Sequence, residues 1–225
     1  MSGTSYLIGI AGPSGAGKSH LALHLAERLE APVLPLDRYY RDLSHLPPQD
    51  RARANFDEPA ALEHELLLAH ITDLYHGKAV DIPTYDFSVH TRTDETQRLQ
   101  PAHFVIIEGL FTFHWPELCA LLGTRIYVEM PDDVCLQRRM ERDVRERRRT
   151  PESVAEQYRA MVAPMAERYI RPTRSRAHLV ISGAAPIAEE VARVLDHLQR
   201  GLRPSGFDAD VDTIFRSIGN SPPSR

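Results

Sequence analysis

Apolar residues recur along the chain at two alternating spacings, one typical of buried strands and the other of helices. Short apolar runs rich in β-branched residues predict strands at 7–10, 33–36, 104–107, 126–128 and 179–181. Between them, apolar residues three and four positions apart predict helices at 18–29, 60–75, 115–122, 131–147, 151–169 and 186–198. Pro131, Pro151 and Pro186 suit the first position of their helices. This alternation predicts an α/β protein with a parallel sheet of about five strands flanked by helices.

Three segments fall outside this alternation. Residues 37–59 have no clear period and are rich in Pro, Asp and Arg, whereas residues 79–100 alternate like an extended β-hairpin. Long loops within a compact domain are usually functional, and we expect the hairpin to be a substrate-binding insertion. Residues 201–225 contain several Pro, Ser and Gly, which predicts a flexible tail after a domain that spans residues 1–200.

A glycine-rich motif lies between the first predicted strand and the first predicted helix. Residues 12–19 read G-x-x-x-x-G-K-S, the phosphate-binding loop (P-loop) of enzymes that use nucleoside triphosphates. The glycines let backbone N–H groups turn toward phosphate oxygens, and the N-terminus of the following helix adds a partial positive charge. Lys18 supplies a catalytic cation for the outer phosphates, and the Ser19 hydroxyl is a Mg²⁺ ligand. The predicted phosphate-binding residues are Gly12, Pro13, Ser14, Gly15, Ala16, Gly17, Lys18 and Ser19.

Two carboxylates end predicted strands. Glu108 ends the apolar run before Gly109, and Asp37 ends the run that begins at residue 33. Ligands of open α/β sheets bind at the carboxyl ends of the strands, so both side chains are expected to face the phosphate loop. Glu108 would help to hold Mg²⁺, and Asp37, also a candidate Mg²⁺ ligand, would accept the proton of an attacking hydroxyl. The alternatives are a partly exposed strand-end glutamate and an aspartate that caps a helix.

Arginines are concentrated in residues 138–149, where seven of the twelve positions are arginine. Glu141 and Arg145, and likewise Arg142 and Glu146, are spaced to form ion pairs on a solvated helix, the simpler interpretation of its outer face. The arginines nevertheless outnumber the acids of the run. Because such a cluster can neutralise a phosphoryl group during transfer, we predict an Arg-rich helical lid at residues 138–158.

The overall composition argues against some classes of function. The 225 residues carry a formal net charge of −4, which does not suit a surface that binds nucleic acid. The N-terminal apolar run is too short for a signal peptide or a membrane span. Cys119 and Cys135 have no metal-binding or disulfide spacing, which suits a reducing compartment. We therefore expect a cytoplasmic protein with no nucleic-acid partner and no membrane partner.

Seven segments together resemble one family. They are 37–41 (DRYYR), 55–59 (NFDEP), 83–87 (PTYDF), 90–92 (HTR), 107–109 (IEG), 142–147 (RDVRER) and 157–158 (QY). In these residues, their order and their spacing, the chain resembles the uridine kinases (uridine–cytidine kinases) of the phosphoribulokinase/uridine kinase family of P-loop kinases. The resemblance extends over residues 5–198.

The resemblance implies roles for individual residues. Asp37 matches the base that takes the proton of the ribose 5′-hydroxyl, and Asp57 matches the acceptor of hydrogen bonds from the 2′- and 3′-hydroxyls. Arg147 and Arg149 match catalytic lid arginines near the phosphates, while Ser19 and Glu108 match the Mg²⁺ shell. The residues that match nucleoside contacts are Asp37, Tyr40, Asp57, Tyr85, Phe87, His90, Arg142, Arg149 and Gln157. On pattern alone, Tyr85 and Phe87 could equally pack beneath the hairpin.

As an activity, the resemblance implies phosphorylation of uridine and cytidine to UMP and CMP, as in pyrimidine salvage. The phosphate donor would be ATP or GTP with Mg²⁺, and the partners a small-molecule nucleoside and a nucleoside triphosphate. The resemblance also implies a homotetramer or homodimer with end-product control by CTP. Arg148 stands where the family's lid usually has glycine, which removes a flexible hinge point.

Two other classes of function stay open on the residues alone. One is a P-loop kinase of another small alcohol, such as a vitamin riboside, pantothenate or a sugar phosphate. The other is a nucleotide-dependent switch or an RNA-binding module that uses the arginine run. Asp57, Tyr85 and His90 favour a nucleoside kinase, because a sugar phosphate calls for basic groups in place of Asp57. The acidic total argues against RNA binding.

Overall fold

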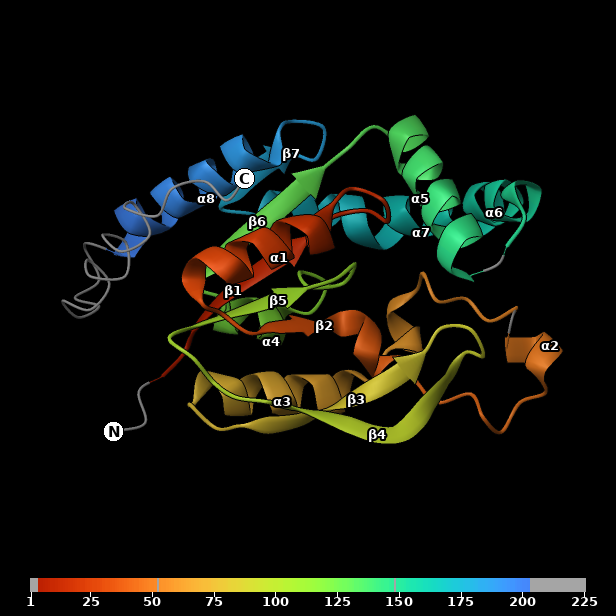
Figure 1. Ribbon diagram of the computed structural model, residues 1–225, viewed down its shortest axis with the longest axis horizontal. Helices are drawn as coiled ribbons and strands as arrows, with labels where there is room; N and C mark the ends of the chain where they lie inside the picture. Colours follow the sequence, from red (N-terminus) through yellow and green to blue (C-terminus); the bar gives the residue numbers. More distant parts are fainter. Residues whose placement is uncertain (1–3, 52, 148, 203–225) are drawn as a thin grey trace.

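A parallel sheet of five strands lies at the centre of the computed structural model, which describes residues 4–51, 53–147 and 149–202 (Figure 1). Its strands, in spatial order, are β2 (Val33–Pro35), β5 (Phe104–Glu108), β1 (Tyr6–Ala11), β6 (Thr124–Glu129) and β7 (Leu179–Ser182). All the pairings between neighbours are parallel. The predicted α/β fold with a five-stranded parallel sheet is confirmed.

The strands are continuously apolar because both of their faces are covered. Along β1, Leu7 packs into a core on one side of the sheet, and Ile8 packs into a separate core on the other side. The sequence of β5 is Phe-Val-Ile-Ile-Glu, and every residue of it is buried. A run of β-branched apolar residues is the expected composition of a strand buried on both faces.

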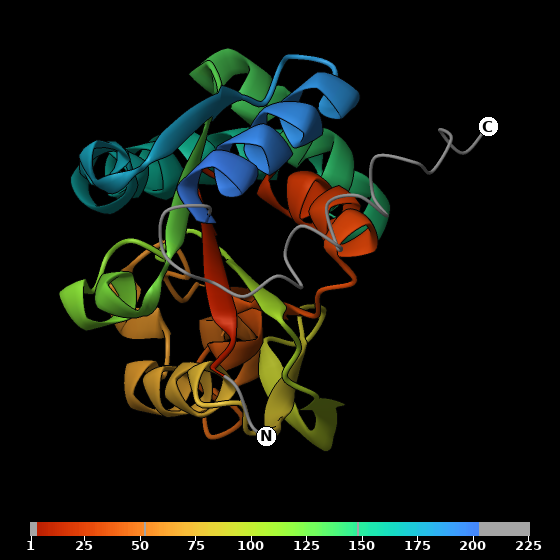
Figure 2. The same cartoon turned by 90° about the vertical axis from the view of Figure 1, so that its left-hand side faces the viewer.

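Helices form a layer on each face of the sheet. The helices α1 (Lys18–Leu29) and α8 (Ile187–Leu202) cover one face, and α3 (His64–Tyr75) and α4 (Pro116–Leu121) contribute to the core on the other. In Figure 2, α8 and α1 lie above the strands and α3 lies below them. None of the helices within the described ranges has the length and apolar character that a bilayer crossing requires.

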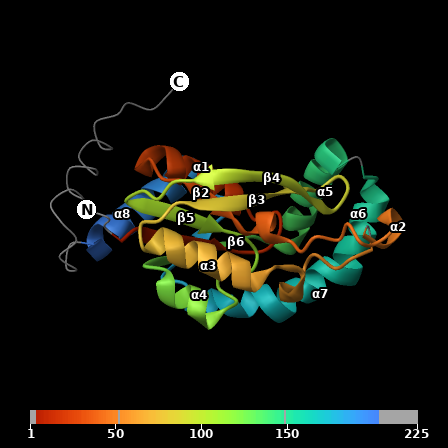
Figure 3. The same cartoon turned by 90° about the horizontal axis from the view of Figure 1, so that it is seen from below.

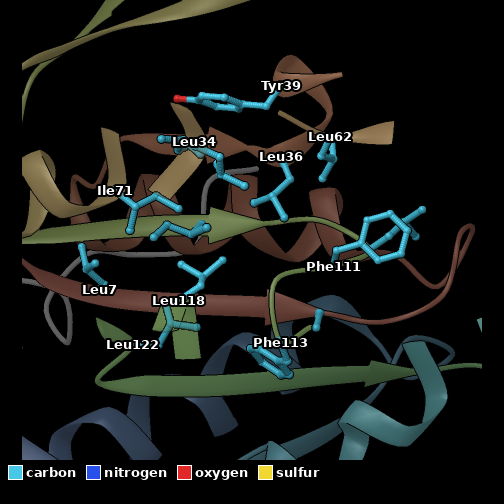
Figure 4. Close-up of a cluster of buried hydrophobic side chains, with 14 of the residues drawn as sticks. Leu7, Leu34, Leu36, Tyr39, Leu62, Ile71, Phe111, Phe113, Leu118 and Leu122 are labelled. Atoms are coloured by element: carbon cyan, nitrogen blue, oxygen red, sulfur yellow. The ribbon is translucent and has the colours of Figure 1, made fainter. Parts of the chain in front are cut away.

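The core on the α3 and α4 side connects the sheet to the segments that carry the site. Figure 4 shows Leu7 and Leu34 of the strands close to Ile71 of α3 and Leu118 of α4, and Leu36 follows β2 directly. Each of these side chains is at most 1 % exposed. Burial of a leucine or isoleucine side chain contributes roughly 1.5–3 kcal/mol, so this contact region holds the end of β2 firmly in place.

The predicted hairpin forms a second, two-stranded antiparallel sheet. It consists of β3 (Val80–Asp86) and β4 (Thr91–Leu99), with an irregularity between Pro83 and Tyr85. The hairpin contacts α3 and the 3-10 helix η1 (Leu36–Tyr39). Its turn lies at the same end of the molecule as α5 (Asp132–Arg147) and α6 (Pro151–Gln157) (Figures 1 and 3). The hairpin turn, the arginine-rich helix α5 and α6 therefore lie at one end of the molecule.

Some predicted boundaries in the first half of the chain are wrong. The strand predicted at 33–36 ends at Pro35, because Leu36 and the residues after it form η1. After η1, the segment 37–59 contains the short helix α2 (Pro48–Arg51). The helix predicted at 60–75 begins at His64, since the preceding residues form the 3-10 helix η2 (Pro59–Ala61).

The helix predicted at 151–169 is not one regular helix. After α6 the chain forms π-helical turns η3 (Tyr158–Val162) and η4 (Ala166–Ile170) on either side of α7 (Ala163–Met165), and then the 3-10 helix η5 (Arg171–Arg176). Pro164 lies between the two π-helical segments. A proline within a helix has no N–H and its ring clashes with the carbonyl four residues earlier, and wider turns accommodate both problems.

Two of the three prolines lie one position before the predicted place. Pro151 is the first residue of α6, whereas Pro131 and Pro186 directly precede α5 and α8. The last helix also continues beyond residue 198, to Leu202. The predicted tail at 201–225 lies outside the described residues except for Gly201 and Leu202, which belong to α8. Its separation from the domain 1–200 stays a prediction.

Candidate active site

A cavity of about 580 Å³ lies beside the carboxyl ends of three neighbouring strands. The strand register pairs Ile10 of β1 and Pro35 of β2 with Glu108 of β5. The chain then continues from β1 into the glycine-rich loop and from β2 to Asp37. Sheet pairing therefore brings the loop and two carboxylates to one edge, as expected for a ligand site in an open α/β sheet.

Glycines shape the loop beneath this cavity. Gly12, Gly15 and Gly17 have φ angles of +148°, +87° and +101°, which other residues rarely adopt. A Cβ atom on Gly15 would lie 2.5 Å from the carbonyl oxygen of Cys135, and one on Gly12 would lie 2.3 Å from that of Val128. Glycine is thus required both for the backbone conformation and for the close approach of the loop to β6 and α5.

Lys18, the first residue of α1, places a buried ammonium group beside the loop. The residue is 8 % exposed, and its Nζ donates a hydrogen bond of 2.9 Å to the carbonyl oxygen of Pro13. Burial lowers the pKa of Lys18, whereas the nearby carboxylates of Glu108 and Asp37 raise it. These carboxylates therefore favour the charged ammonium group in a place where water does not reach it freely.

Glu108 faces the first turn of α1. Its Oε1 accepts a hydrogen bond of 3.0 Å from the hydroxyl of Ser19. Burial raises the pKa of Glu108 and the Asp37 carboxylate raises it further, while Lys18 and the hydrogen bond from Ser19 lower it. Glu108 is only 7 % exposed, so the interpretation as a partly exposed strand-end glutamate is wrong.

Asp37 lies in the first turn of η1, directly after β2. The residue that precedes the first turn as N-cap is Pro35, so the interpretation of Asp37 as a helix cap is wrong. Asp37 lines the cavity together with Glu108 and Lys18. Its carboxylate is therefore placed to interact with a ligand.

The oxygen atoms at the base of the cavity fit a magnesium ion. The Ser19 hydroxyl and the carboxylates of Glu108 and Asp37 are the hard donors that Mg²⁺ prefers. A divalent cation between the carboxylates would relieve the repulsion that raises the pKa of Glu108. Among the described residues, no three His, Cys, Asp or Glu side chains are grouped to enclose a metal ion. Mg²⁺ usually keeps several waters and is bound through one or two carboxylates and substrate phosphates.

Aromatic side chains from the loop before α3 and from the hairpin form one wall of the cavity. The ring centroid of Tyr40 lies 5.2 Å from that of Phe56, 5.5 Å from that of Tyr85 and 6.5 Å from that of Phe87. Tyr85 and Phe87 are themselves 5.2 Å apart. These separations are in the favourable range for aromatic pairs, and such a wall suits a flat ring.

The hydroxyl of Tyr85 is buried and has no hydrogen-bond partner within the part of the chain that the structure describes. Burial raises the pKa of Tyr85 to about 12, so the hydroxyl stays protonated at neutral pH. A buried hydroxyl without a partner destabilises the empty site. A ligand with an acceptor at this position would remove that penalty.

His90, at the end of the hairpin turn, has an unusual backbone conformation with φ of +56°. Its ring stacks on that of Phe56, with centroids 5.0 Å apart and an interplanar angle of 19°. A change of tautomer moves the proton from one ring nitrogen to the other and leaves the ring in the same plane. The stack thus restrains the plane of the ring and allows each nitrogen to be either donor or acceptor.

A buried ion pair connects the aromatic wall to the arginine-rich helix α5. Asp57 is 3 % exposed and Arg139 is 6 % exposed, with 3.5 Å between Oδ1 and Nη1. Arg139 also donates to the hydroxyl of Ser14 at 3.0 Å and to Oε1 of Gln157 at 3.4 Å. The sequence analysis did not single out Arg139 or Phe56. Their positions, four residues before Asp143 on one helix face and directly before Asp57, are the signals that could have identified them.

Asp143, fully buried in α5, gathers three guanidinium groups on the cavity wall. Its carboxylate oxygens lie 2.8 Å from Nη2 of Arg142, 3.6 Å from Nε of Arg139 and 3.8 Å from Nη1 of Arg149. Arg149 also donates to Oε1 of Gln157. The like charges of the arginines would repel one another without this carboxylate between them.

The cavity brings together most of the residues predicted for the site. Those that line it are Ser14, Gly15, Gly17, Lys18, Ser19, Asp37, Tyr40, Asp57, Tyr85, Phe87, His90, Glu108, Arg142, Arg149 and Gln157. Gly12, Pro13 and Ala16 are buried within the loop itself. The side chain of Arg147 and all of Arg148 lie outside the described residues. A role for Arg147 therefore stays a prediction, as does an effect of Arg148 on the lid.

A glycine-rich loop beside the cavity, a buried lysine and a carboxylate pair are what phosphoryl transfer from a nucleoside triphosphate requires. The fold and the site therefore define a P-loop phosphotransferase. Residues 7–186 match the model of the Phosphoribulokinase / Uridine kinase family. The chain belongs to this family, and the family resemblance inferred from the sequence is confirmed.

Relatives of known name agree with this assignment. A uridine kinase from Tolumonas auensis is 45 % identical over 182 residues, which cover 78 % of this chain and 85 % of the relative. A uridine kinase from Chloroflexus aggregans is 41 % identical over 200 residues, covering 86 % and 96 % of the two chains. Among solved structures, phosphoribulokinase from Rhodobacter spheroides has the same fold, with a TM-score of 0.59 and 18 % identity over 82 % of this chain and 74 % of that protein.

The raised pKa of Glu108 predicts a pH-dependent effect of Glu108→Gln on stability. At a pH above its raised folded-state pKa, Glu108 is ionised, and the buried negative charge lowers the free energy of unfolding. This loss of stability decreases as the pH falls toward 4.5, the pKa of the glutamate in the unfolded chain. Without Mg²⁺, we expect the variant to be at least as stable as wild type at pH 8, with the difference disappearing near pH 4.5. Thermal unfolding across this pH range measures the effect.

Glu27→Gln is the control for this experiment, because the Glu27 side chain is 77 % exposed. It is expected to show no pH-dependent difference from wild type. A Glu108→Gln variant that is less stable than wild type at every pH would contradict the assignment of Glu108 as a destabilising buried charge.

Proposed function

We propose that the protein transfers the γ-phosphoryl group of ATP or GTP to the 5′-hydroxyl of uridine and cytidine, which yields UMP and CMP. That it is a nucleoside kinase of the uridine kinase type follows from its relatives, which are 45 % and 41 % identical over most of the chain. One observation carries the choice of acceptor. The phosphate loop, Asp37, the buried carboxylate of Asp57 and the aromatic wall with His90 share a single cavity.

The loop and the arginines would act on the phosphates. Backbone N–H groups of residues 12–17 and the ammonium group of Lys18 bind and orient the donor's phosphate oxygens. Arg142 and Arg149 would turn from Asp143 to the phosphoryl group as negative charge develops on it. Mg²⁺, held by Ser19 and Glu108 with Asp37 nearby, would neutralise phosphate charge when bound. The hydroxyl of Ser19 donates to Oε1 of Glu108 at 3.0 Å, so both oxygen donors lie close together.

Asp37 would remove the proton from the attacking hydroxyl. It lies on the cavity wall with Lys18 and Glu108, where the acceptor and the donor meet. Phosphoryl transfer depends mainly on positioning and charge neutralisation, so one carboxylate that accepts the proton is sufficient.

The remaining polar groups suit a pyrimidine nucleoside. The carboxylate of Asp57 can accept hydrogen bonds from the two vicinal hydroxyls of a ribose. The hydroxyl of Tyr85, which lacks a partner within the described part of the chain, offers a donor to a carbonyl of the base. His90 offers both a donor and an acceptor in the plane of its stack on Phe56.

The alternatives receive less support. A sugar phosphate needs an unpaired positive charge at the acceptor site. The buried cation beside Asp57 is Arg139, and it is already paired, 3.5 Å from Asp57 and 3.6 Å from Asp143. An RNA-binding surface is expected to be strongly basic, whereas the chain carries a formal net charge of −4. A homotetrameric or homodimeric state and a cytoplasmic location stay predictions from the sequence.

The nucleoside panel tests the proposal directly. We expect efficient phosphorylation of both uridine and cytidine, because a change of tautomer lets a His90 ring nitrogen present either a donor or an acceptor to the edge of the base. Adenosine and guanosine are expected to be poor acceptors, since the wall of Tyr85 and Phe87 is suited to one ring. Steady-state rates with the four nucleosides and ATP–Mg²⁺ measure this. A purine nucleoside used as efficiently as uridine would overturn the pocket assignment.

Asp37→Asn tests the proton acceptor. The amide keeps the shape of the side chain but cannot take the hydroxyl proton, so we expect kcat to fall by about 10²–10⁴. Binding of uridine and of ATP, measured by calorimetry, is expected to change little. Asp94→Asn, at an exposed position on β4, is the matched control and is expected to behave as wild type. Retention of more than half of the wild-type turnover would remove Asp37 from this role.

A further inference from the structure

Arg92 lies on the hairpin strand β4, and its side chain connects segments that build the cavity. Its Nε donates a hydrogen bond of 2.9 Å to the carbonyl oxygen of Tyr40, and its Nη2 donates one of 3.2 Å to that of Tyr39. Its Nη1 forms an ion pair with the carboxylate of Glu63. One guanidinium group thus joins the hairpin to the end of η1 and to the start of α3.

The two ends of this connection carry different halves of the proposed acceptor site. On the hairpin, Arg92 is the cross-strand partner of Tyr85 and lies two residues after His90. On the other side, η1 begins one residue before Asp37 and ends at Tyr39. The position of Arg92 therefore links the proposed base pocket to the proposed proton acceptor.

The contacts of Arg92 are well suited to hold a fixed spacing. Its side chain is 18 % exposed, so its charge is largely removed from water and is neutralised by Glu63. The backbone N–H of Arg92 also donates to Oδ1 of Asp42 at 3.3 Å. A guanidinium group presents its donors in a rigid plane and can bind two carbonyls and a carboxylate together, which the single ammonium group of lysine cannot.

We propose that Arg92 is a positioning residue that fixes the spacing between Asp37 and the base pocket on the hairpin. This spacing selects acceptors in which a hydroxyl and a ring are separated as they are in a nucleoside. The inference rests on the proposed function and adds to it the residue that sets acceptor specificity. Arg92 itself touches neither the cavity nor the phosphate loop, since the described residues that line the cavity do not include it.

The donor side of the site is held independently of Arg92. Lys18 and Glu108 belong to α1 and β5, which are placed by the core and by the strand register. A loss of Arg92 is therefore expected to affect the acceptor while sparing the binding of ATP. A residue that merely stabilises the fold would impair both substrates together.

Arg92→Gln and Arg92→Lys, with Arg98→Gln as a control, test this inference in the full chain. Arg98 lies on the same strand and pairs with Asp81 at 2.7 Å, but both side chains of this pair are about half exposed, at 55 % for Arg98 and 52 % for Asp81. For Arg92→Gln we expect kcat/KM for uridine to fall about 10²-fold, the loss typical of a misplacement of about 1 Å. Arg92→Lys keeps the charge but not the planar contacts, and is expected to fall between wild type and Arg92→Gln. Arg98→Gln is expected to match wild type.

A second measurement separates positioning from stability. KM for ATP is expected to stay unchanged in all variants. An unchanged kcat/KM for uridine in Arg92→Gln would overturn the inference, as would parallel losses for uridine and ATP. Wild-type protein that cannot phosphorylate uridine would contradict the proposed function itself.

Discussion

The burial of opposite charges beside the glycine-rich loop is the interaction on which the rest of the site depends. Lys18 and Glu108 are 8 % and 7 % exposed, and an isolated ion in such a place loses several kcal/mol of solvation. Each charge is tolerated because the other is near, yet the pKa of Lys18 is lowered and that of Glu108 is raised. The compensation is therefore incomplete in the free protein. Phosphates and a divalent cation are the ligands that would complete it.

The same principle organises the wall formed by α5. Arg139, Arg142 and Arg149 are held by Asp143, whose carboxylate is fully buried, and Arg139 also meets Asp57. The arginines have internal partners before a donor binds, so the site does not depend on bulk anions to remain compact. A triphosphate that enters the cavity offers them a stronger partner, because bidentate contacts between arginine and phosphate are among the strongest hydrogen bonds in proteins.

The sequence predicted the parts of the structure that depend on local pattern. The strands were predicted from short β-branched runs. The loop at 12–19 was predicted from the spacing of its glycines, lysine and serine, and its glycines have positive φ angles. Carboxylates at strand ends could be placed at one edge because parallel strands converge there. Long-range contacts were not accessible in this way. Arg139 contacts Asp57, which lies 82 positions earlier in the sequence, and Arg92 contacts Tyr40, which lies 52 positions earlier. The local sequence pattern predicts neither contact.

Boundaries were the other part that the sequence did not determine. The chain forms η2 before α3, so α3 begins only at His64, and the π-helical turns flank Pro164, which cannot donate a backbone hydrogen bond. Residues of NFDEP and PTYDF that line the cavity, such as Asp57 and Tyr85, were expected there from the family resemblance and not from the local pattern alone. The arginines that face inward are those that contact the buried Asp143. A run of charged residues does not show which of its members are buried.

The central claim is that a single cavity aligns the donor's γ-phosphate with the 5′-hydroxyl of a pyrimidine nucleoside held by the hairpin. Phosphorus NMR of the product formed from uridine, ATP and Mg²⁺ tests it most directly, because the splitting of the new phosphorus signal identifies the carbon that bears the ester. The account predicts coupling to the two 5′ protons of the ribose and thus uridine 5′-monophosphate as the product. Phosphate on the 2′- or 3′-oxygen, or release of inorganic phosphate alone, would contradict it.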